Sequence, residues 1–458
     1  MKRFKRIAFG LPLLILAFML FFNGGDEEGA GTAKDVAEKD IFAEPTELIF
    51  WWYGESESPG QIKYVERLCA DYNKMHPNIT VTQVNQGVDV LIPNFMAAYE
   101  AQSGPDIVCL WGGIYLLEWV WQGAIVPLND YIDEEELSHW NGSKFSEYDG
   151  KIYGSDLEVH ANFSIYWKDH FRDAGLDPNK PPLTWDDLVK YSAKLKAAGH
   201  APYASGFSGG WGGVILADFM WNYLVDYHDI IKAVIGERHF DEPAFIEYWE
   251  KVDAYNKAGY FNKNAPSIDW TEGWNEWRAG KATFLSLPGQ AALSFVDELG
   301  TDKVGYFPYP ALSDKKVGWV WPMPHSITSW SKHKELAADF LKYFHAKENY
   351  SKMIDIMDAR ILPADDRFDP GIIQEPEHKK WYAKMAMDWM KQKGHNFLAE
   401  SALPWAIIEK GLVIGGQALI LGEFTPREAA DNMEQAAVEW REQNPELLEH
   451  YKIWAANY

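Results

Sequence analysis

One segment of the sequence has the residue types and spacing of a catalytic nucleophile. Residues 206–210, GFSGG, match the G-x-S-x-G pattern that presents a serine hydroxyl on a turn between a strand and a helix. The preceding residues, APYAS, are a poor strand, and most of residues 206–213 are glycine or serine, so the pattern arises easily by chance. We therefore expect a glycine-rich loop that carries Trp211 rather than a nucleophilic Ser208.

The other patterns that carry chemistry do not converge on a reaction. The sequence has no HExxH segment and no phosphate-binding GK[ST] segment, and the glycines of 209–213 lack the lysine that such a loop requires. Histidines are scattered, and carboxylates are so numerous that some pair will always have the spacing of a glycosidase. We expect no enzyme, no metal site and no cofactor.

Tryptophan is the residue type that stands out, with 22 in 458 residues. Its wide apolar face and single N–H donor match the apolar C–H face and the hydroxyl rim of a pyranose ring. Stacking one such face contributes roughly 1–2 kcal/mol by the area it buries. Most of these tryptophans are nevertheless expected in the core, such as Trp185 on the apolar face of a predicted helix.

The charge excludes one class of partner. The chain has 67 acidic and 43 basic residues, a formal net charge of −24. Such a surface repels phosphate backbones, so nucleic acid is not expected as a partner. The charge serves solubility and does not identify a ligand.

The two cysteines are expected to be small buried hydrophobic residues. Cys69 lies on the apolar side of a predicted helix, and Cys109 lies in a predicted strand. A disulfide stays open, because export would permit one.

The N-terminus has the features of an export signal. Basic residues precede an apolar run from Ile7 to Phe22, which Pro12 interrupts. Residues 1–22 are therefore expected to be a signal peptide or an N-terminal anchor, and residues 23–44 a flexible leader. No cysteine follows the run, so a lipid anchor is not expected.

The elements after the leader alternate between strand and helix. A buried strand that runs into a loop is predicted at 48–55, an alternating strand at 79–84 and a buried strand at 104–111, with helices at 61–75 and about 91–102. This order predicts a parallel α/β sheet, in which ligands bind beyond the carboxyl ends of the strands. Trp52, Tyr53, Glu55 and Trp111 are predicted at those ends.

Helices dominate the later part of the chain. Residues 184–199 are predicted as a helix with Thr184 as its N-cap and Gly199 as its end. Thr425 to Glu428 combine a capping box with a proline at the first helical position. The last 60 residues are expected to be largely helical.

Several segments, in order, resemble the extracytoplasmic solute-binding proteins of carbohydrate ABC importers, the family that includes maltose-binding protein. The segments are PDIVCLW (105–111), GAIVPLNDYI (123–132), YDGKIYGSDLEVHANFSIYWKDHFRDAGLD (148–177), LTWDDLVKYSAKLKAAG (183–199), WRAGKATFLS (277–286), VGYFPYPAL (304–312) and SKHKELAADFLKYF (331–344). The resemblance implies a type II periplasmic-binding-protein fold, α/β, with two interleaved lobes and a hinge. One lobe would hold residues 45–158 with 304–345, and the other 159–303 with 346–458.

The resemblance also implies a function and a site. The protein would act outside the cytoplasm as a monomer, capture a carbohydrate between its lobes, and deliver it to the permease subunits of an importer. Closure would follow from ligand contacts that both lobes make only when closed. The ligand-binding residues carried over from the family's motifs are Tyr53, Glu55, Trp111, His160, Trp211, Trp319, Trp321 and Trp405. Near His160, Glu158 is an equally good match.

Two departures from the family leave alternatives open. Many relatives have a Gly-x-Trp after the AGKA segment, where this chain has Gln290. The lipid-bearing cysteine is also missing. The same fold could instead bind a cationic solute such as a polyamine, because the chain is acidic and aromatic cages hold amines.

Overall fold

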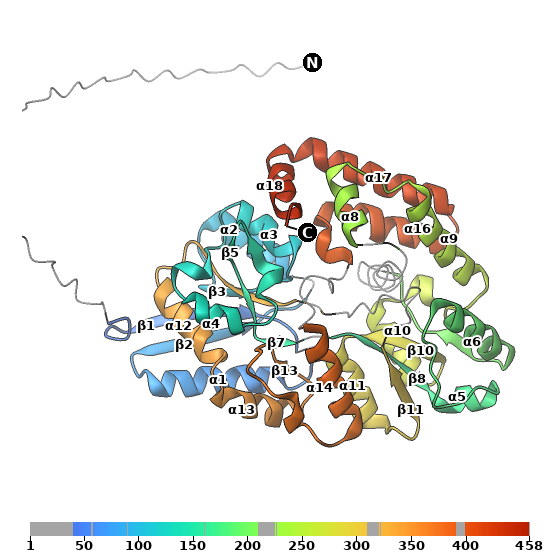
Figure 1. Ribbon diagram of the computed structural model, residues 1–458, viewed down its shortest axis with the longest axis horizontal. Helices are drawn as coiled ribbons and strands as arrows, with labels where there is room; N and C mark the ends of the chain where they lie inside the picture. Colours follow the sequence, from blue (N-terminus) through green and yellow to red (C-terminus); the bar gives the residue numbers. More distant parts are fainter. Residues whose placement is uncertain are drawn as a thin grey trace, which may run out of the picture. The chain divides into compact units, whose positions relative to one another are not determined.

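The computed structural model describes residues 40–55, 58–88, 90–159, 161–208, 225, 227–308, 320, 322–390 and 399–457. Residues 41–458 form one compact unit. Two mixed sheets organise this unit, and helices cover both (Figure 1).

The first sheet contains the predicted parallel strands. Its order is β2-β1-β3-β12-β6, in which β1 is parallel to β2 and β3, and β12 is antiparallel to β3 and β6. The strands are β1 (Thr46–Trp52), β2 (Ile79–Asn85), β3 (Ile107–Cys109), β6 (Ser155–Asp156) and β12 (Pro324–Ile327). Residues on β1 and β3, among them Leu48, Phe50 and Ile107, are fully buried, as expected for a sheet covered on both faces.

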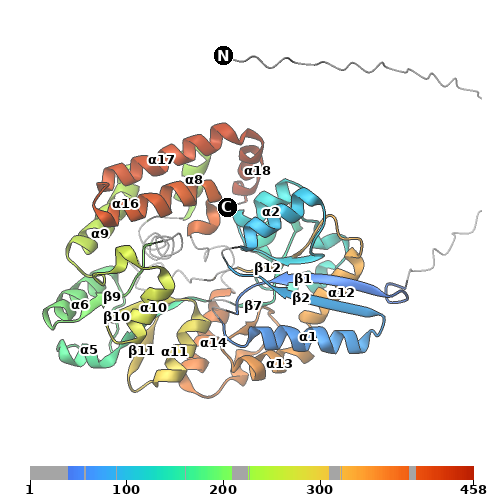
Figure 2. The same ribbon diagram turned by 180° about the vertical axis from the view of Figure 1, so that it is seen from behind.

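Six helices accompany the first sheet. They are α1 (Gln61–Met75), α2 (Leu91–Ala101), α3 (Ile114–Trp121), α4 (Glu134–His139), α12 (Lys334–Phe344) and α13 (Glu348–Met357). Figure 2 shows α1 and α13 on one side of the sheet and α2 on the other. The predicted helices at 61–75 and 91–102 are confirmed to within one residue.

The second sheet has the order β11-β8-β10-β9. Its strands are β8 (Phe163–Trp167), β9 (Ala201–Tyr203), β10 (Ala282–Leu287) and β11 (Val304–Phe307). Its helices include α5 (Lys168–Asp173), α6 (Trp185–Ala197), α9 (Pro243–Lys257), α10 (Trp270–Arg278), α11 (Gly289–Leu299) and α14 (Glu377–Met390). Residues 201–203 are thus a strand, and the expectation that APYAS is a poor strand was wrong for its first three residues.

A helical layer formed by α8 and the C-terminal part of the chain packs against α9. It consists of α8 (Tyr227–Ile235), α15 (Trp405–Ile407), a π-helical segment (Ile408–Ile414), α16 (Gly415–Leu421), α17 (Pro426–Gln443) and α18 (Pro445–Ala455). Figure 1 shows α8, α9, α16 and α17 next to one another. The predicted helical C-terminus is confirmed, with the capping box of Thr425 and Glu428.

The described chain passes between the two sheets at several places. Residues 157–162 lead from β6 to β8, and within them β7 (Glu158–Val159) pairs with β13 (Leu362–Pro363). Strand β4 (Glu147–Tyr148) pairs with β5 (Lys151–Ile152) in a small hairpin beside the first sheet. Each sheet therefore contains segments that are distant in sequence.

The two sheets do not divide the chain at the residues where the sequence predicted the lobe boundaries. Strand β11 pairs with β8 in the second sheet, although residues 304–345 were expected in the first lobe. Helix α13 packs against α1, although residues 346–458 were expected in the second lobe. We propose lobes that follow the sheets, with crossings after β11 and after α13.

Both cysteines are buried and unlinked, as expected from their positions. Burial raises the pKa of the Cys69 thiol to about 12. Among the helices of the described residues, none has the length and apolar character needed to cross a membrane.

Candidate functional site

The ends of β1 and β3 bring two predicted site residues together. Tyr53 follows β1 directly, and Trp111 lies two residues after β3. Because the two strands are parallel neighbours, both residues leave the same edge of the sheet. Their rings meet edge to face, with centroids 5.3 Å apart and an interplanar angle of 62°. Both residues are buried.

The contact continues from Trp111 across α3 to the C-terminal layer. The Tyr115 ring lies 5.9 Å from Trp111 and 6.0 Å from Trp405, measured between centroids. Trp405 is 39% exposed, and it begins α15. We call Tyr53, Trp111, Tyr115 and Trp405 the aromatic row. It reaches from the first sheet to the helical layer that packs against α9.

Two glycines allow the chain after Trp111 to pass between neighbouring segments. A Cβ atom on Gly112 would lie 2.7 Å from the ring of Pro322, and one on Gly113 would lie 2.3 Å from the Ser401 carbonyl oxygen. Gly113 also has a φ of 74°, which disfavours any other residue. The WGG sequence therefore brings the aromatic row close to the loop that carries Trp405.

Glu55 has a structural contact that the sequence did not indicate. Its two carboxylate oxygens accept the backbone N–H groups of Gly60, at 3.0 Å, and Ile62, at 2.7 Å. These groups belong to the free N–H donors at the start of α1, where a carboxylate is favourable. Glu55 thus holds the loop after β1 on α1, and its expected contact with a ligand stays a prediction.

Glu158 lies in a buried polar cluster between the sheets. Its Oε1 atom accepts a hydrogen bond of 2.7 Å from Gln61 Nε2. Burial raises the pKa of the neighbouring Asp156 carboxyl, and the charge of Glu158 raises it further. The alternative residue, His160, lies outside the described residues, as do Trp211, Trp319 and Trp321.

Gln290 lies in the first turn of α11 and is buried. This is the position at which many relatives were expected to have a tryptophan. Sequence reasoning also missed Tyr115, on α3. The signal that could have found it is the helix that starts directly after Trp111 and the two glycines.

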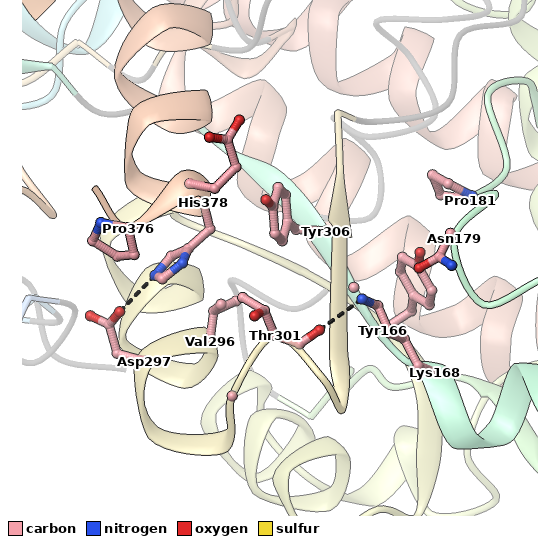
Figure 3. A pocket seen from close by; sticks show the side chains of 13 residues that line it. Tyr166, Lys168, Asn179, Pro181, Val296, Asp297, Thr301, Tyr306, Pro376 and His378 are labelled. Atoms are coloured by element: carbon pink, nitrogen blue, oxygen red, sulfur yellow. Dashed lines mark hydrogen bonds and ion pairs between the residues drawn. The ribbon is translucent and has the colours of Figure 1, made fainter. Parts of the chain in front are cut away.

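A cavity of about 600 Å³ opens on the second-sheet side, beside β11 and α11 (Figure 3). None of its lining residues belongs to the aromatic row. Two of its polar pairs are His378 with Asp297 at 2.7 Å, and Lys168 with the Thr301 carbonyl oxygen at 2.7 Å. The aromatic row is therefore the stronger candidate for a ligand site.

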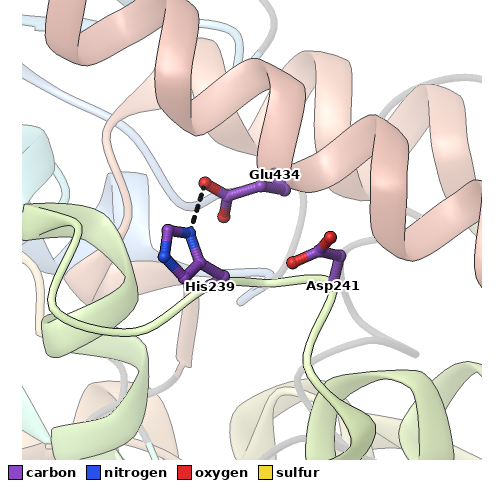
Figure 4. A group of neighbouring side chains, drawn as sticks. All are labelled: His239, Asp241 and Glu434. Atoms are coloured by element: carbon purple, nitrogen blue, oxygen red, sulfur yellow. Dashed lines mark hydrogen bonds and ion pairs between the residues drawn. The ribbon is translucent and has the colours of Figure 1, made fainter.

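His239, Asp241 and Glu434 bring one nitrogen and two carboxylate oxygens within 4.8 Å of one another (Figure 4). Glu434 also pairs with Arg441 at 2.9 Å, and Asp241 pairs with Arg427 at 3.2 Å. Two guanidinium groups beside the cluster oppose a bound cation. We assign this cluster as an ion-pair network.

Comparison with known proteins identifies the family of this chain. The family model described as bacterial extracellular solute-binding protein matches residues 57–350. An uncharacterised ABC transporter extracellular-binding protein of Pyrococcus horikoshii is 28% identical over 278 residues, which cover 59% of this chain and 63% of the relative. The sn-glycerol-3-phosphate-binding periplasmic protein of Shigella flexneri is 30% identical over 231 residues, 47% of this chain and 51% of the relative. The match thus spans between half and two thirds of these relatives.

A solved structure supports the fold over a larger part of the chain. A chitin oligosaccharide binding protein superposes with a TM-score of 0.76 and 21% sequence identity, covering 86% of this chain and 98% of that one. The α/β binding-protein fold expected from the sequence is therefore confirmed. The family whose model matches this chain consists of solute-binding proteins and not of enzymes.

Proposed function

Because the chain belongs to the bacterial extracellular solute-binding proteins, we propose that it captures a carbohydrate, most suitably an oligosaccharide, and delivers it to an ABC importer. The observation that carries this proposal is the aromatic row, whose four rings extend from the first sheet to Trp405 on the helical layer. A succession of rings suits a ligand made of several pyranose units, because each ring can stack on one apolar sugar face.

The burial of the row suggests how a ligand enters. Tyr53 and Trp111 are buried, whereas Trp405 presents 39% of its surface. We infer that a sugar first meets Trp405 and reaches the other rings when the sides that carry the two sheets move apart. Contacts to both sides would then favour the closed arrangement.

The remaining predicted residues belong to the same proposal. His160, Trp211, Trp319 and Trp321 are proposed as ligand-binding residues on the family's motifs alone. Glu55 is proposed to support Tyr53 from the N-terminus of α1, because both of its oxygens hold that helix.

We further propose that the protein acts as a monomer outside the cytoplasm, beside the permease subunits of the importer. The basic start and the apolar run of residues 7–22 support export through an N-terminal signal.

A ligand screen tests the proposal. Purified protein lacking residues 1–39 is mixed with monosaccharides, oligosaccharides of several linkages, sn-glycerol 3-phosphate, amino acids and polyamines. We expect an oligosaccharide to raise the Tm and to quench tryptophan fluorescence, and the sugar to be recovered unchanged. A response only to amino acids would contradict the proposal.

The polyamine alternative makes a different prediction in the same screen. Binding of a cation to an acidic site weakens sharply between 20 and 500 mM salt, because ions screen the charges, whereas sugar binding hardly changes. A ligand whose affinity falls steeply with salt would favour the cationic solute.

A further inference from the structure

The last helix of the chain belongs to the second-sheet side but also contacts the first-sheet side. Helix α18 packs against α8 and α17, which belong to the helical layer, and against α3, which accompanies the first sheet. Figure 1 shows α18 at the end of the layer that lies beside α3. This contact therefore joins the two lobes that we propose from the sheets.

Three aromatic rings from the two sides meet at this contact. Trp121 ends α3, Tyr148 lies on β4, and His450 lies on α18. The His450 ring is nearly parallel to the Trp121 ring, at an interplanar angle of 11° and a centroid distance of 5.9 Å. The Tyr148 ring lies 5.7 Å from His450 and 5.8 Å from Trp121, again between centroids. We call Trp121, Tyr148 and His450 the ring latch.

One hydrogen bond crosses the ring latch. The Tyr148 hydroxyl group and His450 Nδ1 share this bond at a distance of 2.6 Å. Both side chains are half-buried, so the bond is exchanged against water when the rings separate, and its net contribution is modest. Aromatic pairs in tilted or offset arrangements add a further small stabilisation. The ring latch is therefore a contact that holds the lobes together and still releases them.

Helix α18 is fixed more firmly to its own side. The buried Tyr451 hydroxyl group donates a hydrogen bond of 2.8 Å to the Ala402 carbonyl oxygen. The Tyr451 ring lies 5.2 Å from Trp454 and 6.1 Å from Trp440 on α17, and all three residues are buried. The same ring reaches Trp121 only at 6.3 Å. A movement that separates the sides would therefore break the half-buried latch and leave α18 attached to the helical layer.

The ring latch lies away from the place where the chain crosses between the sheets. Strand β7 pairs with β13 at this crossing, and Figures 1 and 2 show β7 below the middle of the unit and α18 near its top. When two rigid lobes rotate about a hinge, atoms move in proportion to their distance from the hinge axis. The latch therefore separates further than contacts beside the crossing when the lobes open.

We propose that the ring latch holds the two lobes together without a ligand, and that it must open before a ligand enters or leaves. This inference deepens the proposed function and rests on it for the ligand whose passage the latch controls. None of the three residues belongs to the aromatic row. The latch sets the rates of capture and release from outside the ligand site.

A contact that exists only between closed lobes acts on the ligand through the closed population. A bound ligand leaves only after the lobes part, so a contact that slows opening also slows release. Such a contact also raises the apparent affinity in proportion to the closed fraction that it adds. Loss of the latch hydrogen bond should therefore speed release about fivefold, the effect of about one hydrogen bond.

A buried position next to the latch reports opening without a ligand. Ser401 is 3% exposed and faces Gly113 on the first-sheet side, since a Cβ atom on Gly113 would lie 2.9 Å from the Ser401 Cβ atom. It precedes Ala402, to which α18 is bonded. In Ser401→Cys, iodoacetamide reaches the new thiol when the lobes separate, whereas both native cysteines are buried. If closing is fast relative to alkylation, the alkylation rate follows the open fraction.

The alkylation rate is measured at pH 8 from the intact mass. We expect the Ser401→Cys thiol to react much more slowly in the native protein than after unfolding in guanidinium chloride. Addition of Tyr148→Phe should raise the native rate about fivefold, because it removes the hydroxyl group and keeps the ring. His450→Phe should have the same effect. Both changes together should add little to either one, because they remove the same bond.

The matched control removes a tyrosine hydroxyl bond that stays within one lobe. The Tyr99 hydroxyl group on α2 donates a hydrogen bond of 3.0 Å to the carbonyl oxygen of Gln122, which follows α3. Tyr99→Phe should leave the alkylation rate of Ser401→Cys unchanged. His450→Ala, which removes a ring as well as the bond, should give a faster rate than His450→Phe.

Release is then measured by stopped-flow tryptophan fluorescence for an oligosaccharide found in the screen. The complex is diluted rapidly, and the recovery of fluorescence gives the release rate. We expect Tyr148→Phe to release the sugar about fivefold faster than the unaltered protein, and Tyr99→Phe to release it at the native rate.

The outcomes separate the inference from the proposed function. Alkylation of native Ser401→Cys at the rate of the unfolded chain overturns the latch, as do equal rates with and without Tyr148→Phe. An equal acceleration by Tyr99→Phe, or faster alkylation with an unchanged release rate, also overturns it. If no sugar binds in the screen, the proposed function fails, and the alkylation rates still decide whether the latch holds the lobes together.

Discussion

At the scale of single residues, the aromatic row shows how ring contacts can extend a site beyond one sheet edge. Tyr53 and Trp111 meet because parallel strands end together, and Tyr115 adds a ring from the helix that follows. Trp405 then comes from a segment almost 300 residues later in the chain. The row is thus a product of tertiary structure rather than of local sequence.

Replacement of Trp405 by alanine should weaken binding of the ligand about tenfold, because a stacked ring face contributes roughly 1–2 kcal/mol. Trp405→Phe should lose less, since it keeps a smaller aromatic face. Titration calorimetry at pH 8 measures both. Trp330→Phe, which removes an indole that packs against Phe95 and Tyr99 rather than against a ring of the row, serves as the control. Equal affinities for all three variants would exclude a stacking role for Trp405.

The sequence predicted part of the aromatic row. Trp111 and Trp405 were predicted because motifs of the family carry them, and their contact with a ligand stays a prediction. Tyr115 was missed because α3, with the sequence IYLLEWVW, is apolar at seven of its eight positions and has no periodicity that distinguishes one face. Glu55 was expected to contact a ligand, and only the structure showed that both its oxygens hold α1.

At the scale of elements, local signals identified most helices correctly. Thr184 accepts the N–H of Asp187 at 3.1 Å, and α1 and α6 begin within a residue or two of their predicted starts. The short strand β9 was missed because a three-residue strand has too few positions for an alternating pattern. Its pairing with β10 is what stabilises it.

The capping box of α17 gives a quantitative expectation. The Thr425 hydroxyl oxygen accepts the Glu428 N–H at 3.2 Å, and a Glu428 oxygen accepts the Thr425 N–H at 2.8 Å. Thr425→Ala should lower the local stability of the first turn of α17 by about 1 kcal/mol, because one helix donor loses its acceptor. Hydrogen exchange of those amides measures the effect, and Thr425→Ser should keep the native protection. Native exchange rates in the alanine variant would show that the box contributes nothing.

At the scale of the whole molecule, sequence order does not determine which segments share a sheet. Helix α13 packs on α1, yet it follows β11, which belongs to the other sheet. The motifs fixed the order of the elements well, but the position of each crossing depends on strand pairing between distant segments. This is why the chain does not change from one sheet to the other at residues 304 and 346, where the sequence predicted the lobe boundaries.

The two cysteines give an expectation for the folded protein as a unit. Cys69 and Cys109 are buried and unlinked, and the thiolate is the reactive form of a cysteine. We expect Ellman's reagent to detect no thiol in the native protein at pH 8 and two thiols per chain after unfolding in guanidinium chloride. Immediate reaction of a native thiol would contradict the burial, and a disulfide would leave none to detect after unfolding.

The unreactive cysteines also make the protein suitable for direct observation of domain motion. Cysteines introduced in place of the exposed residues Glu100, on α2, and Lys194, on α6, would be the accessible thiols of such a variant, so maleimide dyes would attach there without removal of the native pair. Energy transfer between the dyes in single molecules would then record each opening and closing event. The rates with which a ligand is trapped and released could be read from individual trajectories, in a protein whose core has not been altered.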